Sequence, residues 1–284
     1  MRIGLCYFST DYGIDIRELA RAAEERHFES LLLPEHTHIP TSRRTPFPRG
    51  GELPKAYSHT HDPFVALAFA ASVTSKILLG TGVALIPQRE PIVTAKSVAS
   101  LDRLSNGRFL FGIGGGWNVE EMENHGASYD TRFQLMRERV LAMKALWTQE
   151  AAAYHGQMVN FDPVWLYPKP LQQPHPPILL GGPSDYTLKR VVEFCDGWLP
   201  NARGGFNDPN AFNPKDAVAR LRRAADAARR DYSTLSISAF GAPAEEAVLE
   251  QYREAGIDRA LLMIPDLTRD EILTVVDQYA RLIH

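Results

Sequence analysis

The sequence has few cysteines, no charge excess and no long apolar run, and each absence excludes a class of protein. Its 284 residues include two cysteines, 31 basic and 34 acidic side chains, for a formal net charge of −3. A chain without a basic excess is not a general nucleic-acid binder. No stretch approaches the ~18 apolar residues that a membrane-spanning helix needs. No basic leader with a cleavage site precedes the first apolar run, so we expect a cytoplasmic protein.

The remaining composition is that of an ordinary folded chain, with 44% hydrophobic and 23% charged residues. Cys6 and Cys195 lie far apart within apolar runs. We expect buried free thiols rather than a disulfide, as is usual in a reducing compartment.

Short apolar runs alternate with amphipathic segments along the whole chain, and eight of these runs predict strands. Most are continuously apolar, as is typical of parallel strands covered on both faces. Eight such units in about 280 residues predict a (β/α)8 TIM barrel, formed by residues 1–284 as a single domain. The predicted strands are Ile3–Phe8, Ser30–Leu33, Ile77–Ile86, Phe109–Ile113, Ile178–Leu180, Gly197–Leu199, Leu235–Ala239 and Ala260–Ile264.

Two connections are too long for simple barrel loops, and we treat them as insertions at about 35–61 and 151–177. The first leaves the carboxyl end of a predicted strand, where barrel enzymes place their catalytic residues. The second follows a predicted helix and so begins at the opposite face. A shorter loop, Asn201 to Asn213, follows the sixth predicted strand and also belongs to the catalytic face.

Glu35 and His36 directly follow the second predicted strand. A histidine exchanges a proton near neutral pH, and an adjacent carboxylate can orient or charge it. The alternative is a polar strand end whose side chains only hydrogen-bond the loop, and the residues alone leave both open. We take His36 as the candidate acid or base and Glu35 as the group that orients it.

Four histidines lie in or beside the first insertion, at positions 36, 38, 59 and 61. Two His-x-His pairs could hold a metal ion, which would make the chain a metal-dependent hydrolase. Both pairs fall in predicted loop, however, and not on a strand that would turn both rings to one face. Asp266, just after the last predicted strand, is the acidic candidate to complete such a site. We therefore predict no metal and keep the hydrolase as a less favoured alternative.

Three glycine-rich stretches stand at predicted strand ends. Gly80 to Ala84 interrupts the third strand, which indicates a bulge or the close approach of another group. Gly112 to Trp117 would let a ligand approach the backbone, but it lacks the spacing of the dinucleotide fingerprint. Gly181 and Gly182 precede Ser184 at a predicted helix start, where backbone amides suit a phosphate. Each stretch could be an ordinary turn, whereas the set favours a ligand site.

The ordered set of motifs resembles the luciferase-like superfamily of flavin and deazaflavin oxidoreductases, and within it the F420-dependent branch. The resemblance implies a TIM barrel with insertions, a homodimer, and coenzyme F420, or alternatively FMN, bound at the carboxyl ends of the strands. The stretches that carry it are Pro34–Pro40, Leu79–Val83, Pro91–Asp102, Phe111–Trp117, Gly181–Gly182 and Asp196–Trp198.

The resemblance also implies roles for single residues. In F420-dependent relatives a bulge with a cis peptide bond backs the cofactor ring, and the matching bond joins Gly82 to Val83. Glu35 and His36 match a carboxylate–histidine pair beside that ring. Apart from the resemblance, we expect His38 and Trp117 in the substrate pocket, with Trp117 as an aromatic wall. The implied cofactor-binding residues are Gly82, Val83, Ala84, Gly115, Gly116, Gly181, Gly182 and Ser184.

Two departures limit what can be transferred from the sugar-phosphate dehydrogenases of this superfamily. They have a glutamate where Trp117 stands and an aspartate where Glu35 stands, which argues against sugar-phosphate oxidation here. The sequence therefore predicts an oxidoreductase that uses F420 to exchange a hydride with a small organic substrate. The alternatives are an FMN-dependent monooxygenase, which needs a flavin reductase as partner, and a cofactor-binding protein without turnover. Neither nucleic acid nor a membrane is an expected partner.

Overall fold

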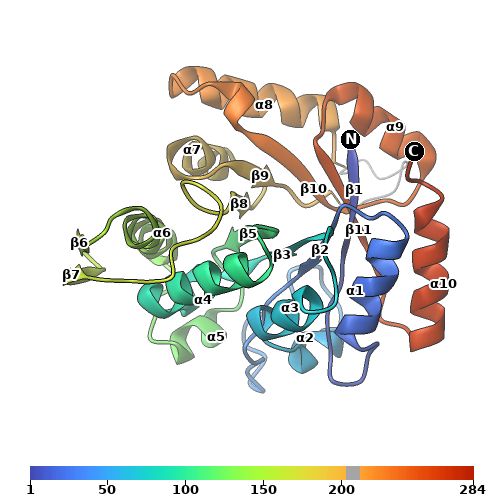
Figure 1. Cartoon of the computed structure of the whole chain (residues 1–284), viewed down its shortest axis with the longest axis horizontal. Coiled ribbons are helices and arrows are strands. Elements are labelled where there is room, and N and C mark those ends of the chain that lie inside the picture. The colour runs from blue at the N-terminus through green and yellow to red at the C-terminus, as the bar shows by residue number, and fades with distance from the viewer. Residues whose placement is uncertain (203–211) are drawn as a thin grey trace.

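The computed structural model describes residues 1–202 and 212–284, and its strands close into a parallel barrel surrounded by helices (Figure 1). Neighbouring strands follow the order β3-β2-β1-β11-β10-β9-β8-β5-β4, and an additional pairing of β3 with β5 closes the ring. The predicted (β/α)8 TIM barrel is confirmed. Its strands are β1 (Arg2–Cys6), β2 (Ser30–Leu33), β3 (Leu78–Thr81), β4 (Ala84–Leu85), β5 (Phe109–Gly114), β8 (Ile178–Gly181), β9 (Gly197–Leu199), β10 (Ser236–Ala242) and β11 (Arg259–Met263).

Helices begin and end where local chemistry stabilises them. Asp62 accepts a hydrogen bond from the backbone of Val65 ahead of a helix that opens with a proline, and Thr268 forms a capping box with Glu271. Gly256 ends a helix in the left-handed region, with φ of 86°. The helices are α1 (Ile16–Glu25), α2 (Ala56–His59), α3 (Pro63–Ala71), η1 (Ile86–Gln88), α4 (Pro91–Leu104), α5 (Val119–Asn124), α6 (Arg132–Thr148), α7 (Asp185–Phe194), α8 (Pro214–Ala227), η2 (Tyr232–Thr234), α9 (Glu246–Ala255) and α10 (Arg269–Ala280).

Alternate residues of the strands fill two different regions. Leu31 and Leu33 belong to the large cluster shared with the helices, whereas Leu32 between them belongs to a small separate cluster. Because neighbouring strand residues point to opposite faces, the small cluster is the filling of the barrel. It consists of Leu32, Leu110, Leu179, Leu199 and Leu261. The barrel is closed by packed leucines, so a ligand must bind above this layer at the strand ends.

The third barrel position corrects the predicted strand Ile77–Ile86, because two short strands occupy it. Gly80 pairs with Leu110 and Ala84 with Ile113. The chain thus advances four residues from β3 to β4 while its neighbour β5 advances three. One extra residue is therefore inserted, which is the bulge that the glycines of this stretch predict. The peptide bond between Gly82 and Val83 is cis, as the resemblance implies.

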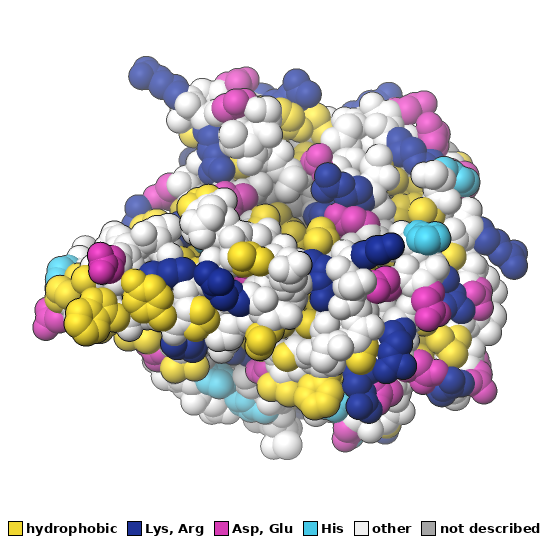
Figure 2. Space-filling view, viewed as in Figure 1, with side chains coloured by type: hydrophobic (Ala, Val, Ile, Leu, Met, Phe, Trp, Pro, Cys, Tyr) yellow, Lys and Arg dark blue, Asp and Glu magenta, His cyan; other side chains and the backbone are white. Residues whose placement is uncertain are grey.

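The second insertion contains an antiparallel hairpin, β6 (Ala152–His155) and β7 (Asn160–Val164), which the sequence analysis missed. Figure 2 shows hydrophobic side chains gathered at the end of the molecule that carries it. Trp165 and Tyr167, just after β7, are 80% and 54% exposed. Cys6 and Cys195 are both buried, as predicted, and Cys195 is a free thiol. Within the described residues, the helices are all too short or too polar to cross a bilayer.

Candidate active site

A cavity of about 440 Å³ lies above the leucine layer, at the carboxyl ends of the strands. Side chains from the first insertion cover it, among them Arg49 and Tyr57. Ala84 is fully buried in β4 and His38 lies outside, so neither lines the cavity. The other predicted site residues do line it: Glu35, His36, Gly82, Val83, Gly115, Gly116, Trp117, Gly181, Gly182 and Ser184.

The imidazole of His36 is fixed on both ring nitrogens. Its Nδ1 lies 2.9 Å from Oε2 of Glu121, whose side chain is fully buried, and the indole Nε1–H of Trp117 donates to its Nε2 over 3.3 Å. An indole nitrogen can only donate, so Nε2 is the unprotonated nitrogen of a neutral ring and Nδ1–H donates to Glu121. The arrangement holds a base at the cavity wall whose lone pair accepts from Trp117, with a carboxylate behind it that stabilises the protonated ring.

Glu121, not Glu35, is the carboxylate that contacts His36, so the predicted orienting role of Glu35 is wrong. One carboxylate oxygen of Glu35 accepts from the backbone N–H of Leu85 at 2.7 Å, and the other accepts from both Nε and a terminal nitrogen of Arg89. Burial opposes the charge of Arg89, but its hydrogen bonds to Glu35 and Asp62 dominate and raise its pKa. Glu35 therefore ties β4 and the start of α4 to the end of β2.

The floor of the cavity is backbone because side chains do not fit there. A Cβ at Gly114 would lie 2.5 Å from Val83, and one at Gly181 would lie 3.2 Å from the same side chain. At Gly115 a Cβ would come within 2.7 Å of the Phe133 ring. Three strand ends thus meet around Val83 with their peptide groups uncovered. Such a floor lets a flat ligand approach the backbone directly.

A helix N-terminus closes one side of the cavity. Gly182 has φ of 135°, which a residue with a side chain rarely adopts, and the hydroxyl of Ser184 accepts from the backbone of Thr187 to cap α7. The indole of Trp198 donates to the carbonyl of Gly182 at 2.7 Å and holds the turn in place. The amides of this turn are the part of the wall best suited to an anionic group.

An aromatic cluster forms the roof. The ring of Tyr57 lies 5.2 Å from His36 and 4.7 Å from Phe8, centre to centre, and Phe47 packs edge-on against both Tyr57 and Trp117. Tyr57 and Phe47 come from the first insertion, so this segment supplies the apolar side of the pocket. Asn201 also lines the cavity, whereas residues 203–211 of the predicted loop Asn201 to Asn213 lie outside the described residues.

The other histidines of the first insertion are engaged separately. His38 contacts Thr37 and Asn124 through its two ring nitrogens, so its predicted place in the substrate pocket is wrong. His59 pairs with Asp11, and His61 with Ser9. Tyr12 donates to Asp266. In the described part of the chain, no three metal-ligating side chains come together.

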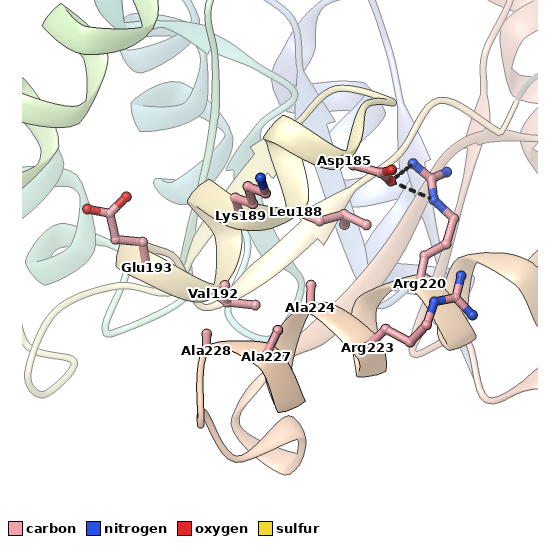
Figure 3. Close-up of a pocket in the computed structure, with 10 residues that line it drawn as sticks. All are labelled: Asp185, Leu188, Lys189, Val192, Glu193, Arg220, Arg223, Ala224, Ala227 and Ala228. Carbon is pink, nitrogen blue, oxygen red and sulfur yellow. Dashed lines mark hydrogen bonds and ion pairs between the residues drawn. The ribbon is translucent and has the colours of Figure 1, made fainter.

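A second cavity, of about 930 Å³, lies between α7 and α8 (Figure 3). Its polar side chains are paired in part, since Arg220 binds Asp185 at 2.7 Å. It is lined by helix residues and by none of the glycines or histidines at the strand ends. We therefore place the candidate active site in the cavity at the strand ends.

Sequence analysis missed two groups that shape this site. Glu121 stands three residues after Asn118, whose side chain caps α5. The pattern Asn-x-x-Glu is typical of a helix N-terminus, so it was a signal in the sequence that could have drawn attention to Glu121. Arg89 has no local signal, because its partner Glu35 lies 54 positions earlier in the chain.

A family model described as luciferase-like monooxygenase matches residues 10–273. Among curated proteins, Rv0953c of Mycobacterium tuberculosis is 38% identical, over 99% of this chain and 98% of its own length. The F420-dependent hydroxymycolic acid dehydrogenase of the same organism is 29% identical, over 74% of this chain and 54% of its own. An FMNH2-dependent dimethylsulfone monooxygenase of Pseudomonas putida is 36% identical, over 39% of this chain and 31% of its own length.

Among solved structures, the monooxygenase RslO1 of Streptomyces bottropensis superposes with a TM-score of 0.78. It is 19% identical, over 99% of this chain and 98% of its own, which shows the shared fold alone. The family contains both F420-dependent and FMN-dependent enzymes. Together with the family match over residues 10–273, the barrel and its glycine-floored site identify the chain as a member of the luciferase-like monooxygenase family.

Proposed function

We propose that the chain is an oxidoreductase that uses coenzyme F420 to exchange a hydride with an apolar organic substrate. In this proposal His36 moves the proton that accompanies the hydride. The observation that carries the proposal is the His36 ring, with Nδ1 held by buried Glu121 and an unprotonated Nε2 at the cavity wall. Oxidation of an alcohol to a ketone releases one hydride and one proton, and this ring is placed to take the proton.

The residues present fit a flat ring cofactor with an anionic tail. The cavity of about 440 Å³ is within the range of small-molecule sites. Gly114, Gly115 and Gly181 line the cavity, where a ring can approach peptide groups directly, and the turn at Gly182 and Ser184 offers amides to a phosphate. Coenzyme F420, when bound, supplies the hydride chemistry, and the chain supplies position and proton transfer.

The surrounding residues prepare the proton step. The carboxylate of Glu121 stabilises the positive charge that His36 gains when Nε2 takes a proton. The substrate hydroxyl must displace the N–H of Trp117, which occupies the lone pair of Nε2 in this structure. Tyr57 and Phe47 cover this corner with apolar surface and keep water away from it. In the reverse direction, the protonated ring returns its proton to the substrate oxygen.

The F420-dependent relative supports the deazaflavin, whereas the FMNH2-dependent relative favours a second candidate function. In that second case the chain is a flavin-dependent monooxygenase that receives reduced FMN from a reductase. In either case we propose that the chain acts as a homodimer, as the family resemblance implies.

The test is the exchange His36→Phe, which keeps a ring in the wall and removes the proton-carrying nitrogens. With a substrate found by screening alcohols and ketones against F420, we expect turnover to fall roughly 10²–10⁴-fold, while the dissociation constant of F420 changes little. His38→Phe is the matched control, because His38 lies outside the cavity. Equal turnover in the two variants would remove His36 from the mechanism.

A further inference from the structure

Two arginines flank one wall of the cavity. Phe133 lines the cavity, the Cζ of Arg132 lies 4.3 Å from the centre of its ring, and the Cζ of Arg190 lies 4.2 Å from the same centre. Since both distances share one end, the two guanidinium carbons are at most about 8.5 Å apart. Arg132 opens α6 and Arg190 lies in α7, so two separate elements bring the charges together.

Neither arginine forms a close ion pair with a carboxylate among residues 1–202 and 212–284. Arg132 donates to the carbonyl of Tyr129, and its Nε is buried without any hydrogen bond in that part of the chain. The carboxylates nearest to Arg190 along α7 are engaged elsewhere: Glu193 pairs with Arg137 at 2.6 Å, and Asp185 pairs with Arg220.

Holding two like charges this close opposes folding unless something neutralises them. Burial, and then the positive charge of Arg132, lower the pKa of Arg190, and the negative charge of Glu193 offsets this only in part. A bound anion would reverse this repulsion, and guanidinium groups are well suited to carboxylates and phosphates. Thr187, one turn before Arg190 in α7, also lines the cavity. The arginines thus lie on the side of the cavity that α7 forms.

We propose that Arg132 and Arg190 form a subsite for carboxylates that a cofactor carries beyond its phosphate. This inference rests on the proposed function, since F420 continues past its phosphate into a chain of glutamates, whereas FMN ends at its phosphate. The turn at Gly182 and Ser184 already offers amides to one phosphate. Two further cations, separated from the cavity by the Phe133 ring, match the additional negative charges of the tail.

The experiment measures the dissociation constants of three ligands by fluorescence quenching. The ligands are F420 with several glutamates, its form without glutamates, and its deazaflavin precursor that lacks both phosphate and tail. The variant is Arg190→Gln, because the Arg190 guanidinium stacks on the Phe133 ring and the exchange removes its charge at similar size. Lys189→Gln is the matched control, since Lys189 is the adjacent cation of α7 and faces the groove between α7 and α8 (Figure 3).

We expect Arg190→Gln to raise the dissociation constant of the glutamate-bearing F420 roughly tenfold. The dissociation constant of the precursor should not change. Arg190→Lys should restore part of the loss, and Lys189→Gln should change none of the three constants. A loss shared equally by the form without glutamates would assign the arginines to the phosphate and overturn the proposal. Unchanged binding of all three ligands would overturn it as well.

The same titration separates this proposal from the proposed function. If the parent chain binds no form of F420, the F420 assignment fails, and the subsite fails with it. If the parent binds F420 and the variant binds it equally well, only the subsite fails. The melting temperature of the unliganded Arg190→Gln variant is a second readout. It should not fall, because the exchange removes repulsion rather than a hydrogen bond.

Discussion

Replacing Glu121 by glutamine should disable the proton relay while keeping its shape. The Glu121 carboxylate accepts from the backbone N–H of Thr37 at 3.1 Å and from Nδ1 of His36 at 2.9 Å. Glutamine has one acceptor oxygen and one NH2 group, so only one of these donors can be satisfied. If the NH2 faces His36, the ring proton must move to Nε2, where it points at the N–H of Trp117. Either orientation leaves a buried donor without an acceptor.

The size of the effect follows from this geometry. A buried donor that loses its acceptor costs about 1–3 kcal/mol, and we expect the free energy of unfolding to fall by that amount. Turnover should fall roughly 10²–10⁴-fold, because His36 either carries its proton on the wrong nitrogen or loses the charge that stabilises its protonated form. The dissociation constant of the cofactor should change little, since Glu121 does not line the cavity.

The assay compares turnover at saturating cofactor with urea unfolding of the same preparations. Glu120→Gln is the control, because Glu120 is the neighbouring buried carboxylate and binds Ser42 and Thr45 rather than His36. It should lose stability without the loss of turnover. If Glu121→Gln were no less active than Glu120→Gln, the relay through Glu121 would be refuted.

Three further predictions concern stability. Burial opposes ionisation of Glu120, but hydrogen bonds, the strongest from Thr45, lower its pKa from 4.5 to about 2. Its contribution is therefore present above pH 4.5 and is lost as the pH falls towards 2, so the difference in unfolding free energy between parent and Glu120→Gln should shrink over that window. Gly112→Ala should lower the urea midpoint, because a Cβ would lie 1.9 Å from the carbonyl oxygen of Thr81, and overpacking costs about 1–3 kcal/mol or more; an unchanged midpoint would contradict this. Arg89→Met should lower the free energy of unfolding by about 3–5 kcal/mol, because it leaves the buried Glu35 carboxylate without its cation. In a double-mutant cycle, adding Glu35→Gln should recover part of that free energy.

The sequence was informative where function depends on strand ends. Apolar runs predict all eight barrel positions, and in a parallel barrel their carboxyl ends must meet. His36, Gly115 and Gly182 therefore had to lie near one another, and they line one cavity. The glycines at positions 80 and 82 predicted the bulge, and a Cβ at Gly80 would lie 2.8 Å from the carbonyl oxygen of Leu110.

The sequence was uninformative where two side chains meet across the fold. Adjacency suggested that Glu35 orients His36, yet consecutive residues point in different directions at a strand end, and Glu35 turns to Arg89 instead. The partner of His36 is Glu121, 85 positions away, and periodicity does not specify such a contact. The hairpin of β6 and β7 was missed because it pairs only with itself, outside the barrel rhythm.

The most direct test of the central claim is a fluorescence titration of the purified chain with coenzyme F420 and, in parallel, with FMN. We predict saturable binding of F420 and markedly weaker binding of FMN, because a turn suited to a phosphate lines the cavity and two further cations stack on the Phe133 ring in its wall. Tight binding of FMN with no binding of F420 would contradict it and make the chain a flavin-dependent monooxygenase candidate.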